Sequence, residues 1–135
     1  MTVMVAQVEV GFDRESPLMG GQTFENVAEM VVRISRQDGE SLAALGHEGF
    51  YELRGLPVNM GRRSMSNYER ANKPPRPSVY PTWMTSDEAA VTFSKLQAQG
   101  VLTQLPTLDA ILAYMRVLEE SGCYGTIRIV SWLQF

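Results

Sequence analysis

Basic side chains are concentrated in the middle of this chain, and aromatic residues stand among them between positions 54 and 85. Six of the twelve basic residues lie between positions 54 and 76 against one acid, a local charge of +5, while the rest carries six bases and fourteen acids, a charge of −8. Arginine presents a rigid fork that binds carboxylates or phosphates, and tyrosine and tryptophan supply stacking or buried contact area. The candidate binding residues are Arg54, Arg62, Arg63, Tyr68, Arg70, Arg76, Tyr80 and Trp83.

Three interpretations of this segment compete. Its arginines could pair with the protein's own acidic surface, meet an acidic protein or a protein–nucleic acid assembly, or hold the phosphates of a nucleotide or nucleic acid. The net charge of −3 and the pI near 5.2 weigh against a stand-alone DNA-binding domain, because such a domain is usually basic overall. The overall negative charge weighs less against binding of a compact nucleotide, because such a ligand needs only two or three arginines.

We therefore expect a non-enzymatic binding or inhibitor protein that occupies a partner's surface through residues 54–85. Phage-encoded antagonists of bacterial defence and immunity proteins are the general class that this profile suggests. A nucleotide-binding protein or small nucleotide-acting enzyme, with the same arginines on phosphates, is the alternative, and RNA or DNA binding is a weaker one. The sequence leaves open whether the segment is ordered without its partner.

The single histidine, His47, is the first candidate for catalysis or metal binding elsewhere in the chain. No HxxxH, HExxH or CxxC companion accompanies it, so no metal site and no cofactor is predicted. A general base needs a nucleophile and an orienting acid within reach, and Glu48, Glu52 and Cys123 are the groups that folding could bring to it. A catalytic role for His47 stays open, but we predict no catalytic residue.

Other potentially reactive groups have structural interpretations. Gly20-Gly21 could cradle a phosphate before a helix, but it matches neither GxGxxG nor GxxxxGK[ST], and paired glycines are primarily turn residues. Cys123 follows a predicted helix end, where the field disfavours a thiolate. The acid pairs Asp87-Glu88 and Glu119-Glu120 lie at predicted helix ends, where solvated charges are routine.

Length and composition favour one intracellular domain over residues 1–135. One cysteine excludes an intramolecular disulfide, which favours a reducing compartment. The N-terminus lacks the basic region of a signal peptide, and no apolar run approaches the ~20 residues that span a bilayer. We expect a cytoplasmic protein without membrane contact, of open oligomeric state.

The elements that must position the basic segment are clearest at the two ends of the chain. Residues 3–12 alternate as a strand does, with Met4, Ala6, Val8, Val10 and Phe12 on one face and Gln7 and Glu9 opposite. Residues 23–36 are ambiguous; we favour a helix capped by Thr23, with a strand as the alternative. Asp38-Gly39 indicates a turn, SLAALG a short helical turn ending at Gly46, and residues 49–55 a short strand.

Five prolines between positions 57 and 81 predict a long irregular loop over residues 54–85. Beyond it, Thr85 to Glu88 form a capping box that begins a helix ending at Gly100. A second helix runs from Thr107 to Ser121-Gly122, and TIRIVSWLQF is a final strand. The predicted fold is a single small α+β domain, whose short sheet includes the N- and C-terminal strands, is packed by two C-terminal helices, and carries the long basic proline-rich loop outside.

Overall fold

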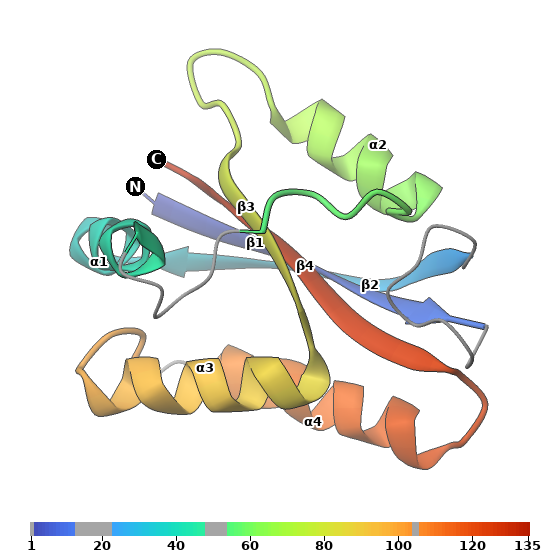
Figure 1. Ribbon diagram of the computed structural model, residues 1–135. Helices are drawn as coiled ribbons and strands as arrows, with labels where there is room; N and C mark the ends of the chain where they lie inside the picture. The colour runs from blue at the N-terminus through green and yellow to red at the C-terminus, as the bar shows by residue number, and fades with distance from the viewer. Residues whose placement is uncertain (1, 13–22, 48–53, 104–105) are drawn as a thin grey trace.

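The computed structural model describes residues 2–12, 23–47, 54–103 and 106–135, with the side chains of 43–47 excepted. One four-stranded antiparallel sheet, in the order β2-β1-β4-β3, forms its centre (Figure 1). The strands are β1 (Thr2–Gly11), β2 (Phe24–Ile34), β3 (Val79–Thr85) and β4 (Thr126–Gln134). The helices are α1 (Arg36–His47), α2 (Arg62–Ala71), α3 (Ser86–Ala98) and α4 (Pro106–Glu120).

The predicted fold class is confirmed: the sheet contains both terminal strands, which lie side by side at its centre. Helices α3 and α4 cover one face, and α2 lies on the other (Figure 1). The larger core lies under α3 and α4, where Phe93, Leu96, Ile111 and Met115 are buried against the sheet. No helix among the described residues is long and apolar enough to cross a membrane.

Strand β1 is buried on both faces along its whole length. Its predicted alternation is confirmed from Met4 to Val10, which face the larger core, whereas Phe12 lies beyond the strand and is exposed. The opposite face does not meet solvent. Val3 and Val5 pack there in a second, smaller cluster, and Gln7 and Glu9 are also fully buried.

The preference for a helix over residues 23–36 is wrong, because these residues form strand β2. Val31 and Val32 pair with Val5 and Met4 of β1, and Val32 is buried while Val31 is exposed, which is the period of a strand. Pairing with a long apolar neighbour outweighs the local helical pattern. The register shifts opposite Val8 and Glu9, and this bulge interrupts the alternation that would have identified the strand.

The turn predicted at Asp38-Gly39 is also wrong, because helix α1 runs through it. The Ser35 side chain accepts a hydrogen bond of 3.0 Å from the Asp38 amide at the start of this helix. A Cβ on Gly39 would lie 2.6 Å from Thr2 Cγ2, so glycine here permits close packing of α1 on β1. The helical turn predicted at SLAALG belongs to this longer helix, and most of the strand predicted over 49–55 lies outside the described residues.

The long loop predicted over residues 54–85 is the third correction, since the segment contains helix α2 and strand β3. Its prolines flank α2, which occupies the proline-free stretch between Pro57 and Pro74. Pro81 lies within β3, an edge strand whose register shifts between Val79 and Thr82. An edge position with a bulge is where a strand tolerates the missing N–H of proline.

The elements after β3 follow the predictions closely. Thr85 caps α3, and its hydroxyl accepts from the Glu88 amide while the Glu88 carboxylate accepts from the Thr85 amide. Gly100 has a φ of +79°, a conformation that glycine adopts readily after a helix end. Helix α4 begins one residue before the predicted start at Thr107, and β4 completes the sheet.

Candidate functional site

Two of the eight predicted binding residues, Arg54 and Trp83, contact each other, and Arg54 also binds helix α3. The Arg54 guanidinium donates to both carboxylate oxygens of Glu88, with an Nη1–Oε1 distance of 2.9 Å. It also donates to the Trp83 carbonyl and lies 4.7 Å from the centroid of the Trp83 ring. These contacts fasten the start of the basic segment to β3 and α3.

This ion pair predicts a specific pH dependence of stability. The hydrogen bond from Arg54 is the main cause that lowers the pKa of Glu88 from 4.5 to about 2. A lowered folded-state pKa gives stability that is present above pH 4.5 and is lost as the pH falls toward 2. The Glu88 side chain is 39% exposed, so after solvent screening we expect a contribution of about 1 kcal/mol.

The measurement is urea unfolding of wild type and Glu88→Gln between pH 6 and pH 2. Glutamine keeps the capping box, so the variant isolates the ion pair. The two free energies of unfolding should differ by about 1 kcal/mol near neutrality and converge as the pH falls through the window between 4.5 and about 2. If the difference between the two free energies of unfolding stayed constant across this pH range, the ion pair would contribute nothing to stability.

Three further predicted residues fix the C-terminal strand or the face beneath α2. Tyr68 meets the Trp132 ring edge-on at 5.1 Å between centroids, and Tyr80 meets Phe135 at 6.3 Å. Arg76 donates to the Phe135 carbonyl at 3.1 Å and to that of Gln134 at 3.3 Å. Their aromatic and basic groups are therefore engaged inside the fold.

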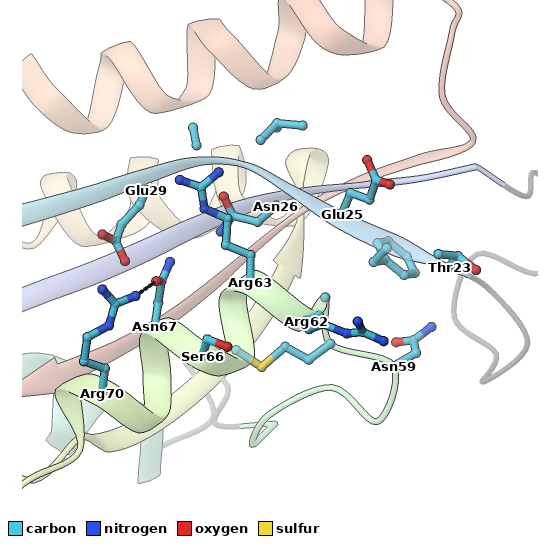
Figure 2. Close-up of a pocket in the computed structure, with 15 residues that line it drawn as sticks. Thr23, Glu25, Asn26, Glu29, Asn59, Arg62, Arg63, Ser66, Asn67 and Arg70 are labelled. Atoms are coloured by element: carbon cyan, nitrogen blue, oxygen red, sulfur yellow. Dashed lines mark hydrogen bonds between the residues drawn. The ribbon is translucent and has the colours of Figure 1, made fainter.

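The remaining three, Arg62, Arg63 and Arg70, project from the exposed side of α2. None of them forms an ion pair with another residue that the structure describes. Arg70 donates to the Asn67 side chain at 2.5 Å, and Figure 2 shows both beside Glu29 of β2. Arg63, Asn67 and Arg70 are spaced i, i+4, i+7 and so share one side of the helix.

This side of α2 forms one wall of a groove of about 1010 Å³. The other wall is seven consecutive residues, from Thr23 to Glu29, at the start of β2. A smaller hollow of about 240 Å³ shares Glu29, Asn67 and Arg70 with the groove and extends it toward Val31 and Trp132. Together they define the α2–β2 groove, which runs between helix and strand.

A polar network beneath the groove attaches α2 to the sheet. The buried Gln7 amide donates to Glu29 at 2.7 Å and accepts from Asn26 at 2.6 Å and from Asn67 at 2.8 Å. Asn26 also donates to the hydroxyl of Ser64 at 2.9 Å. Sequence reasoning missed these residues; the available signal was Gln7, a polar side chain on a strand that is apolar at most other positions.

A buried ion pair fixes the point where α2 begins. Arg128 and Glu9 are 2% and 0% exposed, face each other across β4 and β1, and are joined by an Nε–Oε1 hydrogen bond of 2.8 Å. The second carboxylate oxygen accepts from the Gly61 amide at 2.7 Å, and Arg128 donates to the Asn59 side chain at 2.9 Å. Burial lowers the pKa of Arg128, and Glu9 opposes this effect. Glu9 thus satisfies the backbone N–H of Gly61, the N-cap residue of α2, as a glutamate at N3 does in a capping box.

The other potentially reactive groups named from the sequence either lie outside the described residues or have no catalytic arrangement around them in the described part of the chain. Gly20-Gly21 and the His47 side chain lie outside the described residues, and Cys123 is an exposed free thiol. Of the acid pairs, Asp87 and Glu119 bind Arg116 at 2.8 and 3.2 Å. No group of three His, Cys, Asp or Glu side chains that could hold a metal occurs within the described part of the chain.

Comparison with known proteins gives no outside guide to this groove. No protein-family model matches the chain, and no curated protein and no solved structure matches it at a significant level.

Proposed function

We propose that this protein is a non-enzymatic binding protein that occupies the surface of an acidic protein partner through α2 and the α2–β2 groove. The observation that carries the proposal is the contrast among its arginines. Arg54, Arg116 and Arg128 each bind a carboxylate within the fold. Arg62, Arg63 and Arg70 have no such partner among the described residues and lie on the exposed side of one helix, α2.

The position of these arginines supports an anionic partner. Arg62 and Arg63 begin α2, whose first turn contains no acid. Cations at a helix N-terminus oppose the helix dipole, typically at a cost of about 0.3–1 kcal/mol each at exposed sites. Carboxylates of a partner would offset this repulsion and form bidentate pairs with the guanidinium groups. An inhibitor that blocks its target's surface is one role that such an interface would serve.

The charges on the opposite wall favour a protein over a nucleotide or nucleic acid. Glu25 and Glu29 line the same groove as the arginines, and both would repel a polyphosphate. The negative charge of the whole chain, −3, further weakens attraction to a nucleic acid backbone. A polypeptide can place acids toward α2 and neutral or basic groups elsewhere, so it suits both walls.

The test is affinity capture of binding proteins from a cell lysate with three baits. Wild type is compared with Arg63→Glu/Arg70→Glu and with Arg36→Glu/Lys73→Glu, which changes the net charge equally at exposed positions outside the groove. We expect a partner that wild type and the control retain, that the groove variant loses, and that binds purified wild type directly. Equal recovery by all three baits would refute a role for the arginines of α2.

A further inference from the structure

We infer that the α2–β2 groove receives an extended acidic peptide that adds to the outer edge of β2 as a further strand. This inference rests on the proposed function, because it uses the same arginines. The inference goes beyond the proposed function by assigning the backbone conformation of the partner and the pattern of the partner's side chains.

The edge position of β2 supports strand addition. Strand β2 is the first in the order β2-β1-β4-β3, so its outer edge has no neighbour among the described strands. The strand is eleven residues long, and the unpaired N–H and C=O groups of an edge strand are a template for a further strand. A peptide bound in this way gains main-chain hydrogen bonds that do not depend on its sequence.

The lining of the groove shows that it follows this edge. Side chains of a strand alternate between its two faces, so a hollow on one face would be lined by every second residue. The groove is instead lined by every residue from Thr23 to Glu29. A ligand in it would therefore lie beside the backbone of β2, with α2 on its other side.

The charges of α2 specify acidic side chains in the peptide. Figure 2 shows Glu29 directed toward Asn67 and Arg70, and Glu25 directed away from α2. Arg63 and Arg70 are separated by about 10 Å along the helix axis, while side chains on one face of a strand recur every ~6.8 Å. This separation lies between the spacings of acids two and four residues apart on the α2-facing side of the peptide, so the long arginine side chains must bridge the difference of about 3 Å. Glu29 is already held by the Gln7 amide at 2.7 Å.

An exposed apolar residue at the continuation of the groove adds a second element to the pattern. Val31 is 61% exposed and lines the smaller hollow together with Val5 and Trp132. It lies two residues beyond Glu29 and so shares its face of β2. A peptide with alternating acids followed by an apolar residue on the same face would pair with the arginines and cover Val31.

Backbone N-methylation gives the sharpest test, because it removes N–H donors without changing charge. The probe is a short fluorescein-labelled peptide that alternates glutamate and threonine and ends in valines. It is also made with N-methyl groups on alternate residues, in either of the two phases. Only one phase points its N–H groups at β2, so we expect that phase to weaken binding about tenfold or more, as measured by fluorescence anisotropy, and the other to leave it unchanged.

The outcomes separate the two proposals. If both phases bind equally while Arg63→Glu/Arg70→Glu still loses affinity, strand addition is wrong and the arginine surface stands. If the groove variant binds as the Arg36→Glu/Lys73→Glu control does, both are wrong. Failure of the probe to bind folded wild type would also overturn strand addition. So would a dimer, detected by analytical sedimentation, that the probe does not dissociate. Far-UV circular dichroism checks that each variant is folded, and Arg63→Gln/Arg70→Gln provides a milder second variant.

Discussion

Replacing Arg128 with methionine is expected to lower the free energy of unfolding by about 3–5 kcal/mol, the usual cost of removing one partner of a buried ion pair. Methionine retains much of the aliphatic length of arginine but leaves the Glu9 carboxylate buried without its cation. It also removes the hydrogen bond to Asn59 and the guanidinium that lies 3.5 Å from the centroid of the Phe24 ring. The measurement is urea unfolding followed by circular dichroism.

The matched control is Arg116→Met, which removes an arginine that binds the carboxylates of Asp87 and Glu119 on the surface, where Arg128 binds one buried carboxylate. Exposed ion pairs contribute little to stability because solvent screens them, so the two variants should differ several-fold in effect. Similar losses would show that Glu9 finds water or another donor, and would contradict its role as a buried anchor. Adding Glu9→Leu to Arg128→Met should recover part of the loss, because the unpaired charge is then removed.

The Glu9–Arg128 pair matters for binding because it fixes the start of helix α2. Glu9 accepts from the Gly61 amide, and α2 begins at the next residue. A Cβ on Gly61 would lie 2.8 Å from Glu9 Oε2 and 3.0 Å from the Phe24 carbonyl, so the chain passes very close to the sheet here. The arginines of α2 thus extend from a helix whose start is held by the most buried charges of the described chain.

Much of the fold could be predicted where local signals agree with one another. The capping box at Thr85 and the apolar positions Leu108, Ile111 and Met115 predicted both C-terminal helices. Alternation predicted the two central strands. These signals are set by residues close in sequence, so no knowledge of the tertiary structure was needed to interpret them.

The misassigned elements depend on contacts between distant residues. Strand β2 is specified by its pairing with β1 and by a bulge, and neither leaves a clear period in the sequence. Helix α2 buries Ser64 and holds Asn67 by hydrogen bonds, so it lacks the apolar stripe by which amphipathic helices are recognised. Its flanking prolines were interpreted as interruptions, whereas they lie outside its ends.

The charge pattern of the sequence indicated the candidate segment, but it could not distinguish the arginines that pair within the fold from those that face outward. Sequence alone cannot distinguish Arg54, which reaches Glu88 across 34 positions, from Arg63, because such pairing is decided by the fold. The acidic wall of the groove was also missed, since Glu25 and Glu29 were assigned to a helix. The structure divides the eight candidate residues into five whose side chains contact the rest of the fold and three arginines on the exposed side of α2.

The second large effect is on binding, and it tests the central claim that Arg63 and Arg70 recognise acids. The measurement is fluorescence anisotropy with wild type and Arg63→Glu/Arg70→Glu, each titrated against the glutamate–threonine–valine probe and against the same probe with lysine in place of glutamate. We expect charge reversal to weaken binding of the acidic probe about 100-fold, equivalent to about 2.7 kcal/mol, because two attractive pairs become repulsive.

A direct electrostatic contact predicts that the reversed protein regains affinity for the lysine probe, which wild type should bind poorly. Arg36→Glu/Lys73→Glu serves as the control for net charge and should bind the acidic probe within about twofold of wild type. The predicted result is this exchange of preference with an unaffected control. Loss of the acidic probe by the control to the same extent, or no gain of the lysine probe by the reversed protein, would contradict the assignment of α2 as the recognition surface.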